Sequence, residues 1–343
     1  MNTNPATLQD IARLAGVSSA SVSRALNGRP GVSAATRAAI ARIAKEQNFS
    51  GNDSARALSS GKTGRVAVTL PEVNAEYFAR ILAGAAEVFR REGMSLILEF
   101  THHRADAQED ALRRILHLGV DGALLLLPTE NPKELQALHD TGFPFVVIDA
   151  LDQLTLPSPW ITSTNSLGAQ QATEHLLGLG HRRIAIITGA PDDLASRERL
   201  SGVRQAMKTA GLALDEGLVR DGTFTDPDSG FEAALELLRA PDRPTAIFAF
   251  NDDLAFGALR AVHQLGLVVP QHVSVVGFDD LRAASLVSPA LTTVRQHLTE
   301  MGSTAADILV QRIAGINPPG MQIQLSTELI VRGSTAPPAP DHQ

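Results

Sequence analysis

The stretch TLQDIARLAGVSSASVSRAL, residues 7–26, determines how the amino-terminal part of the chain is interpreted. Thr7 precedes Asp10 by three residues, a spacing similar to the capping box that begins a helix. Gly16-Val17-Ser18 predicts a turn, because glycine supplies a flexible backbone and serine can cap the next helix. We therefore predict a helix-turn-helix whose second helix covers Ser18–Leu26.

The second helix of such a motif enters the major groove of DNA with its amino-terminal residues first. Ser19, Ala20, Ser23 and Arg24 are expected to be exposed there, and Arg24 suits a bidentate contact to guanine or a phosphate contact. A third helix, capped near Ser33, is predicted to extend to about residue 47. The alternative is an ordinary three-helix bundle, since this geometry also occurs in proteins that bind no DNA.

Charge divides the chain into a basic start and an acidic remainder. The 343 residues contain 30 Lys and Arg against 37 Asp and Glu, a formal net charge of −7. Residues 1–65 contain nine basic and three acidic side chains, a net charge of +6, which leaves −13 for the other 278 residues. This asymmetry is typical of a nucleic-acid-binding module joined to a different kind of body.

Composition excludes several classes of protein. Apolar residues make up 44%, enough for buried cores, and the length predicts two or three domains. No cysteine is present, which excludes disulfides, thiolate metal sites and a cysteine nucleophile. The sequence has no apolar run of membrane-spanning length and no visible secretory signal, so we expect a cytoplasmic protein.

From residue 66 onward, apolar strand-like runs alternate with amphipathic helical stretches. Continuous apolar runs are typical of parallel strands buried on both faces, with helices as crossovers. A Pro-rich segment at Thr155–Trp160 divides the alternation into two series of similar size. The predicted strands are Val66–Leu70, Ser95–Phe100, Gly122–Leu127 and Phe145–Asp149, then Arg183–Gly189, Leu218–Phe224, Ala246–Phe250 and Val273–Asp279.

The predicted fold class is an all-α helix-turn-helix headpiece followed by an α/β body of two doubly wound parallel-sheet subdomains. Ligands of such sheets bind beyond the carboxyl ends of the strands, so a ligand cleft is expected where the two sheets face each other. The predicted boundaries are 1–50 for the headpiece, 51–64 for a linker, 65–335 for the body and 336–343 for a disordered tail.

Several motifs follow one another along the chain. The first is residues 7–49, and the second is Asn52-Asp53-Ser54-Ala55-Arg56-Ala57-Leu58. The body motifs are VDGALLLLP (120–128), HLLGLGHRRIAIITG (175–189), FAFNDDLAFGALRA (248–261), VSVVGFDD (273–280) and SPALTTVRQ (288–296). In this order they make the chain similar to the lactose-repressor (LacI-type) family of bacterial transcription regulators, and residues 52–58 resemble the hinge helix of that family.

The resemblance implies a repressor-type regulator of a carbohydrate operon with a periplasmic-binding-protein-like body. It implies a hinge helix and linker at 51–64, and subdomains at about 65–163 with 295–323 and at about 164–294 with 324–333. It implies a homodimer on a pseudo-palindromic operator, one headpiece for each half-site. Leu58 stands where a leucine of the family wedges into the minor groove and kinks the DNA. A small effector in the cleft then changes operator affinity. No apolar heptad follows Arg332, which favours a dimer over a tetramer.

Two hinge residues depart from the family pattern. Gly51 replaces a proline that commonly precedes Asn52, and Asp53 is acidic beside the DNA backbone. Glycine costs preorganisation and aspartate repels phosphate, so both weaken the expected contact between hinge and DNA. The predicted DNA-binding residues are Thr7, Ser18, Ser19, Ala20, Ser23, Arg24, Asn27, Ser33, Thr36, Asn52, Ala55 and Leu58.

The resemblance also assigns residues to the effector cleft. The predicted contacts are Asn74, Tyr77, Phe78, Asp149, Trp160, Asn165, Arg199, Phe224, Asn251 and Asp279. Carboxylates, amides and an Arg fork suit the hydroxyl groups of a neutral sugar, and an aromatic ring suits its C–H face. We expect a xylose- or glucose-based sugar, with a purine or sugar phosphate as the alternative.

Structural roles are the alternative for several of these residues. Trp160 could only seal the crossover between subdomains, Phe224 could belong to the core, and Asp149 could be an internal hydrogen-bond partner. Arg197 is interpreted as a solvated ion-pair partner. The pair His102-His103 has no further ligand at metal spacing, so no metal or other cofactor is expected.

No enzyme is predicted, because the Walker, GxGxxG and GxSxG patterns are all missing. A transport-type sugar receptor would have a similar body, but the basic headpiece argues against it.

Overall fold

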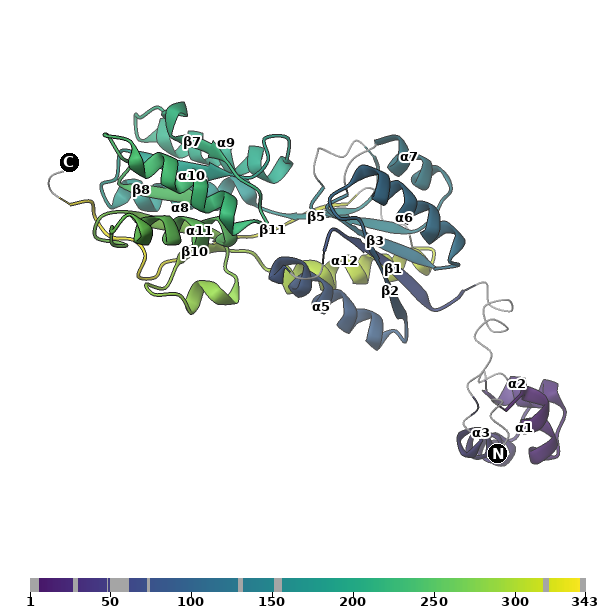
Figure 1. The fold of residues 1–343 in the computed structure, drawn as a ribbon. Helices are drawn as coiled ribbons and strands as arrows, with labels where there is room; N and C mark the ends of the chain where they lie inside the picture. Colours follow the sequence, from purple (N-terminus) through teal and green to yellow (C-terminus); the bar gives the residue numbers. More distant parts are fainter. Residues whose placement is uncertain are drawn as a thin grey trace. The chain divides into compact units, whose positions relative to one another are not determined.

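The computed structural model describes residues 6–26, 30–47, 49, 62–72, 75–128, 132–150, 156–316 and 321–339 (Figure 1). The chain forms two compact units, residues 1–64 and residues 65–343, and we describe each by itself. The predicted hinge residues Asn52, Ala55 and Leu58 lie outside the described residues, as do Asn27 and Asn74.

The first unit contains three helices, each begun by a hydroxyl side chain. They are α1 (Leu8–Ala15), α2 (Ser19–Leu26) and α3 (Ala34–Glu46). Thr7 and Asp10 form the predicted capping box, and the Ser18 and Ser33 hydroxyls accept hydrogen bonds from backbone N–H groups in the first turns of α2 and α3. The core consists of Ile11, Ala12, Val22, Ala25, Ile40 and Ala44, all buried.

The second unit begins with a six-stranded sheet in the order β2-β1-β3-β4-β5-β11. All its strand pairs are parallel. The strands are β1 (Arg65–Leu70), β2 (Ser95–Phe100), β3 (Gly122–Leu126), β4 (Phe145–Ile148), β5 (Trp160–Ser163) and β11 (Gln322–Leu325). Helices α5 (Glu76–Arg91) and α12 (Leu298–Ile313) cover one face, and α6 (Ala105–His117) and α7 (Pro132–Asp140) cover the other. We call this part the first lobe.

The second lobe repeats the arrangement in the order β7-β6-β8-β9-β10-β12. The strands are β6 (Ile184–Thr188), β7 (Val219–Asp221), β8 (Ala246–Ala249), β9 (Ser274–Asp279), β10 (Thr292–Arg295) and β12 (Glu328–Ile330). Helices α8 (Asn165–Gly178) and α9 (Leu194–Thr209) pack on one face, and α10 (Pro227–Arg239) and α11 (Asp252–Gln264) on the other. Short 3-10 helices cover Glu216–Leu218 and Arg282–Ser285.

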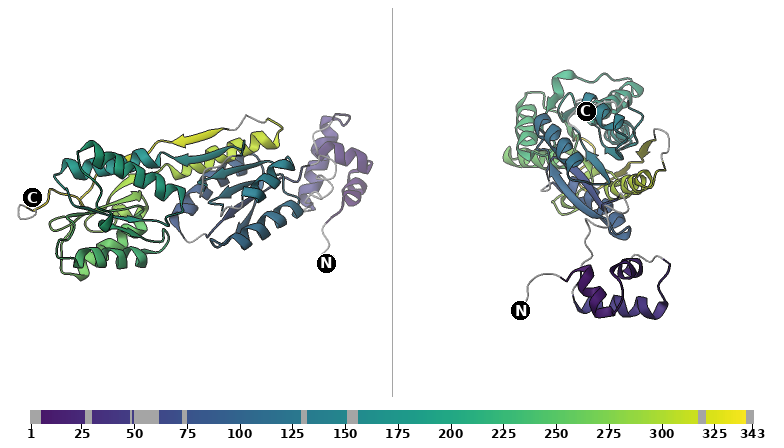
Figure 2. Two further views of the ribbon diagram at one scale, coloured as in Figure 1. Left: turned by 90° about the horizontal axis from the view of Figure 1, so that it is seen from above. Right: turned by 90° about the vertical axis from the view of Figure 1, so that its right-hand side faces the viewer.

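The chain passes between the lobes three times, after β5, after β10 and after β11. Figure 2 shows the yellow carboxy-terminal segments lying against both lobes, although they are last in the sequence. The predicted fold class is confirmed, with two doubly wound sheets and helices on both faces of each. One strand departs from it, because β12 pairs antiparallel to β10 at the edge of the second sheet.

Three features of the body differ from the sequence-based prediction. The alternation did not identify β5, which follows the Pro-rich segment, or β10, β11 and β12 nearer the carboxy-terminal end. The predicted subdomain boundary at 323/324 divides β11. The prediction of a disordered tail from residue 336 is wrong for residues 336–339. The Ala336 carbonyl lies 2.9 Å from His181 Nε2, the Ala336 N–H donates to Ser274 Oγ at 3.1 Å, and Pro338 is buried.

Candidate ligand cavity and DNA-binding helix

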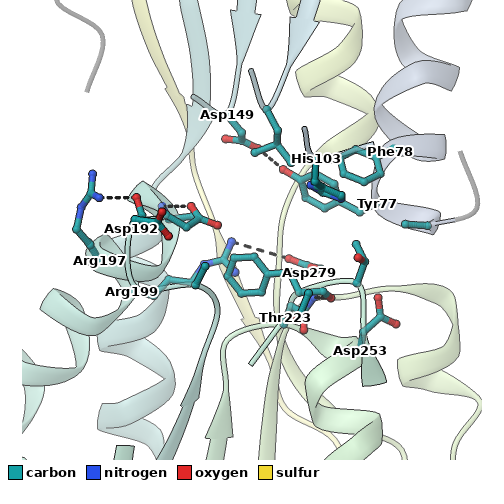
Figure 3. A pocket seen from close by; sticks show the side chains of 18 residues that line it. Tyr77, Phe78, His103, Asp149, Asp192, Arg197, Arg199, Thr223, Asp253 and Asp279 are labelled. Carbon is teal, nitrogen blue, oxygen red and sulfur yellow. Dashed lines mark hydrogen bonds and ion pairs between the residues drawn. The ribbon is translucent and has the colours of Figure 1, made fainter. Parts of the chain in front are cut away.

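A cavity of about 710 Å³ lies at the carboxyl ends of the strands, between the two lobes (Figure 3). The strand order reverses beside β1 in the first lobe and beside β6 in the second, and such switch points are where doubly wound sheets bind ligands. The lining residues are Ala75, Tyr77, Phe78, His103, Leu127, Asp149, Ala190, Asp192, Asp193, Ala195, Arg197, Arg199, Thr223, Phe224, Thr225, Asn251, Asp253 and Asp279.

Arg199 is held rigidly at the base of the cavity. It is 4% exposed, its Nε donates to Asn165 Oδ1 at 2.9 Å, and its Nη1 donates to the Phe250 carbonyl. Its guanidinium carbon lies 3.8 Å from the centroid of the Phe278 ring and 5.5 Å from that of Phe224. Because α9 and the ends of β8 and β9 fix this side chain, its remaining donors are preorganised toward the cavity.

Asp279 ends β9 and faces Arg199 across 4.0 Å. Gln296 Nε2 donates to Asp279 Oδ1 at 2.6 Å. Burial raises the pKa of Asp279 to about 7, although the nearby Arg199 charge and the Gln296 hydrogen bond oppose that shift. The carboxyl group therefore changes its protonation state near neutral pH, where it can donate or accept a hydrogen bond.

Tyr77 and Asp149 form the main polar pair of the first lobe in this cavity. The Tyr77 hydroxyl, near the start of α5, donates to the Asp149 carboxylate at the end of β4. Burial and the Asp149 charge raise the pKa of Tyr77 well above its ordinary value. Burial also raises the pKa of Asp149, against hydrogen bonds that include one from Thr162. The rest of this wall is formed by Ala75, Phe78, Leu127 and His103.

The second lobe supplies most of the polar wall. Asp193 caps α9 by accepting from the Ala195 N–H at 2.9 Å, and burial raises its pKa to about 6. Burial also raises the pKa of Asp253 to about 6. Arg197 lines the cavity while its Nη1 donates to the Asp192 carbonyl at 2.5 Å. Five aspartates and two arginines thus face the cavity, which favours ligands rich in hydroxyl donors.

Backbone strain is concentrated at the same edge of the sheets. Among the described residues, six that are not glycine have positive φ, and all follow or end a strand on the cavity side: His102, His103, Leu127, Asp149, Asp279 and Asp280. Such conformations cost roughly 1–3 kcal/mol each and persist where the surrounding structure fixes them. Four of the six line the cavity.

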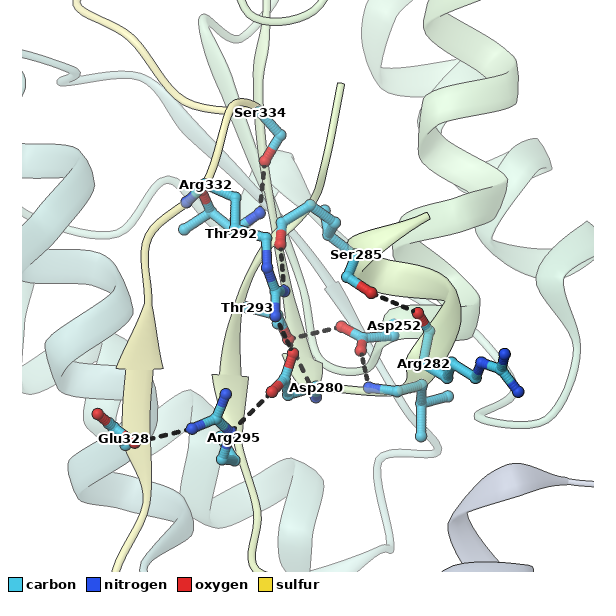
Figure 4. A network of polar contacts seen from close by, with 12 residues as sticks. Asp252, Asp280, Arg282, Ser285, Thr292, Thr293, Arg295, Glu328, Arg332 and Ser334 are labelled. Atoms are coloured by element: carbon cyan, nitrogen blue, oxygen red, sulfur yellow. Dashed lines mark hydrogen bonds and ion pairs between the residues drawn. The ribbon is translucent and has the colours of Figure 1, made fainter. Parts of the chain in front are cut away.

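A buried polar network stabilises the strained turn after β9 (Figure 4). Asp252 is fully buried and accepts from Thr293 Oγ1 at 2.6 Å and from the Leu281 N–H at 2.7 Å. Burial would raise the pKa of Asp280, but hydrogen bonds from Arg332 and Arg295, at 2.5 and 2.7 Å, hold that pKa below its ordinary value. Asp279 directly precedes Asp280 in the sequence, so the network also fixes the position of Asp279.

The structure brings seven of the ten predicted effector residues to the cavity: Tyr77, Phe78, Asp149, Arg199, Phe224, Asn251 and Asp279. Trp160 and Asn165 do not line it, which corrects the prediction for both. Trp160 begins β5 and is 7% exposed within the core under α6 and α7. Asn165 lies behind Arg199 and positions its guanidinium, while its own Nδ2 donates to Glu198 at 3.1 Å.

Sequence reasoning missed several lining residues. His103 was considered only as a metal ligand, and Arg197 only as a solvated partner, whereas both line the cavity. Asp192 and Asp193 follow β6, and Asp253 lies in the first turn of α11. The rule that ligands meet the carboxyl ends of strands applies to all of these positions and is the signal that could have identified them.

In the first unit, the predicted DNA-contacting residues lie at helix starts and on one exposed helix. Ser19, Ala20 and Arg24 are exposed on α2, with Arg24 Nε donating to the Ala20 carbonyl at 3.3 Å, and Ser23 is half-buried there. The hydroxyl groups of Thr36 and Ser33 lie 2.8 Å apart at the start of α3. Thr7, Ser18 and Ser33 each cap a helix, and helix starts favour phosphate binding.

Comparison with known proteins establishes the family. Residues 7–52 match the family "Bacterial regulatory proteins, lacI family", and residues 173–335 match the family "Periplasmic binding protein-like domain". The ribose operon repressor of Escherichia coli (strain K12) is 36% identical over 331 residues, covering 96% of this chain and 99% of that protein. The chain belongs to the LacI family.

Solved structures of LacI-family regulators have the same fold. The Lac repressor dimer bound to operator and the anti-inducer ONPF aligns with a TM-score of 0.88 at 29% identity, covering 97% of this chain and all of that one. A complex of the transcriptional regulator CelR with cellobiose aligns with a TM-score of 0.74 at 36% identity, covering 96% and 99% of the two chains. The protein is therefore a DNA-binding transcriptional regulator. Within the described part of the chain, no helix is long and apolar enough to span a membrane.

Proposed function

We propose that this LacI-family regulator represses a carbohydrate-utilisation operon and that a small neutral sugar in the cavity between the lobes controls its operator affinity. The observation that carries the proposal is the cavity itself, in which a fixed Arg199 fork, several carboxylates and aromatic side chains face one space of about 710 Å³. Whole-ligand sites typically measure roughly 300–1,000 Å³.

The chemistry of the cavity favours polyhydroxylated ligands. Carboxylates accept hydrogen bonds from adjacent hydroxyl groups, and the Arg fork donates to two oxygens. Phe78 and Phe224 offer rings for the apolar C–H face of a pyranose. A sugar phosphate is less favoured, because five aspartates outnumber two arginines. The ribose operon repressor and the CelR–cellobiose complex support the assignment to a sugar.

The helix-turn-helix unit binds the operator in this proposal, with α2 in the major groove and Arg24 at a base edge or phosphate. Two copies of the chain bind two half-sites as a homodimer in the cytoplasm, as the Lac repressor dimer on its operator suggests. The predicted hinge residues Asn52, Ala55 and Leu58 complete the contact, with Leu58 in the minor groove. No catalytic step is part of this function.

Effector binding controls DNA binding because both lobes contribute to one cavity. Tyr77 and Asp149 belong to the first lobe, and Arg199 and Asp279 to the second. A sugar that contacts both sets stabilises one separation of the lobes over others. By linkage, the sugar changes operator affinity by the same factor by which the operator changes sugar affinity.

A sugar panel and a gel-shift assay test the proposal together. We expect one sugar to raise the melting temperature of the full-length protein and to change its affinity for DNA upstream of its own operon. Arg199→Lys keeps the charge but loses the fork, so it should weaken sugar binding at least tenfold and leave operator affinity without sugar unchanged. A full sugar response in this variant, or no binding to any upstream DNA, would contradict the proposal.

A further inference from the structure

A second cavity adjoins the first at Asp253. It measures about 270 Å³ and shares three lining residues with the main cavity: Ala75, Thr225 and Asp253. Its other lining residues are Glu72, Glu76, Pro227, Phe256, Leu281 and Ala283. We call this space the annex. It is smaller than a typical whole-ligand site, so it is better suited to one part of a ligand that continues from the main cavity.

The annex has the same kind of lining as the main cavity. Phe256 is half-buried and supplies an aromatic face, while Glu72, Glu76 and Asp253 supply carboxylate acceptors. Burial, followed by the charges of Glu76 and Glu72, makes ionisation of Asp253 unfavourable. Hydroxyl donors would satisfy these acceptors without adding negative charge. Among the described residues, no three such side chains are arranged to hold a metal ion.

Both lobes form the annex. Glu72, Ala75 and Glu76 come from the first lobe, whereas Phe256 and Ala283 come from the second. Beside it, the Glu76 carboxylate accepts from the Arg282 N–H at 3.0 and 3.1 Å, and Arg80 Nη1 donates to the Asp280 carbonyl at 3.0 Å. These contacts join the lobes directly, so a group in the annex lies where the separation of the lobes is set.

We propose that the effector is a sugar of at least two linked units, with one ring in the main cavity beside Arg199 and the next ring in the annex between Asp253 and Phe256. The inference rests on the proposed function, since it assigns a second subsite to the same sugar. In this proposal the linkage lies beside Asp253, which lines both cavities.

Calorimetry on the full-length protein with matched sugars tests the second subsite. The probes are glucose with cellobiose and maltose, xylose with xylobiose, and galactose with lactose. We expect one disaccharide to bind at least tenfold more tightly than its monosaccharide, and only that disaccharide to change operator affinity. Equal affinities of monosaccharide and disaccharide would overturn the inference and leave the proposed function intact. Binding of none of these sugars would count against the proposed function itself.

Ala283→Phe locates the subsite, because a larger side chain there fills the annex, while Ala283 itself is not among the residues that line the main cavity. It should reduce the affinity for the disaccharide to that for the monosaccharide, whose own affinity stays within twofold. Ser285→Phe, on the same 3-10 helix but outside the lining, is the matched control and should change neither affinity. Unchanged disaccharide binding in Ala283→Phe would overturn the inference.

A second variant decides the outcome if Ala283→Phe loses all sugar binding through misfolding. Phe256→Leu keeps an apolar side chain on α11 but removes the ring from the annex. We expect it to lower disaccharide affinity at least fivefold with monosaccharide affinity unchanged. An equal loss for both sugars, or no loss for either, would contradict a ring bound against Phe256.

Discussion

At the scale of single residues, the cavity is lined by several buried carboxyl groups. Burial makes the ionised form of these groups unfavourable. The pKa values of Asp193 and Asp253 are raised to about 6 and that of Asp279 to about 7. For Asp193 and Asp279, the Arg199 charge and hydrogen bonds from the Ala195 N–H and Gln296 compensate part of the cost. Such raised values are typical of binding sites rather than of solvated surfaces.

Asp193→Asn separates the titration of this carboxyl from its role as a helix cap, since asparagine caps equally well. The native pKa lies above the ordinary value of 3.8, so folding favours the neutral form. The neutral Asp193 carboxyl therefore stabilises the native state of the wild-type protein. This contribution is complete below about pH 4 and is lost as pH rises to about 6. We therefore expect the variant's free energy of unfolding, relative to wild type, to rise by up to about 3 kcal/mol across this range.

Urea denaturation of both proteins between about pH 4 and pH 7 measures this difference. The comparison of variant with wild type cancels the titration of other groups, including histidines whose pKa values burial lowers. A difference that is constant with pH would show that Asp193 does not titrate as described.

The recognition helix α2 is a short element that depends on its neighbours. Arg37 Nη1 of α3 donates to the Ala25 carbonyl at 2.8 Å, near the end of α2. Val22 and Ala25 are buried against α1 and α3, which leaves Ser19, Ala20 and Arg24 on the exposed side. Packing therefore selects the face that is available to DNA.

Arg24→Ala should weaken binding to the specific operator by about 1–3 kcal/mol, because a bidentate contact to guanine is lost. Arg42→Ala is the matched control, since Arg42 is exposed on α3 and pairs with Glu46 at 2.8 Å. Fluorescence anisotropy with operator and random duplexes distinguishes the two. Equal losses on both duplexes in Arg24→Ala would indicate a phosphate contact and no base contact.

Paired helices in both lobes pack closely because glycines lie at their crossings. A Cβ atom on Gly84 of α5 would lie 1.9 Å from the Thr299 carbonyl oxygen of α12, and one on Gly302 would lie 1.9 Å from the Ile81 carbonyl oxygen. A Cβ atom on Gly202 of α9 would likewise collide with the backbone of α8, and one on Gly257 of α11 would collide with the backbone of α10. The glycines thus set the distances between helices.

Gly84→Ala should lower the free energy of unfolding by at least about 2 kcal/mol, although alanine has the higher helix propensity, because overpacking forces α5 away from α12. Gly178→Ala at the exposed end of α8 meets no atom within 4 Å and should be neutral or stabilising by up to about 1 kcal/mol. Thermal and urea unfolding measure both. A stable Gly84→Ala variant would contradict the close crossing.

At the scale of the whole molecule, opposite charges separate two functions along one chain. Residues 1–65 have a net charge of +6 and the rest −13. The basic unit suits a polyanion, whereas the body has a cavity with five aspartates and two arginines. This charge distribution predicts that the basic unit binds DNA and that the cavity disfavours anionic metabolites.

Glucose and glucose 6-phosphate provide a direct test of this charge selection. We expect glucose to bind at least tenfold more strongly than glucose 6-phosphate, because the cavity carries excess negative charge. If a glucose disaccharide binds more tightly than glucose, we expect the same of that disaccharide. The difference should decrease as ionic strength rises. Calorimetry at two salt concentrations measures both effects, and tighter binding of the phosphate would refute the charge argument.

The sequence alone determined the elements and the residue types available for binding. Capping at Thr7 and Ser33 and the continuous apolar runs depend on neighbours a few residues apart, so local pattern predicted the three helices and most strands. Motif register placed Arg199 and Asp279 correctly at the cavity. The site could be predicted to this extent because strand ends meet at one edge of a parallel sheet.

Tertiary structure decided which strand ends face the cavity and which side chains only support its walls. Trp160 is buried beneath α6 and α7, while Asn165 supports Arg199 from behind. The annex beside Asp253 was not predicted, because it depends on how the two lobes meet across long stretches of sequence. Contacts of that kind arise only when the chain has passed between the lobes three times, and no local pattern of residues encodes them.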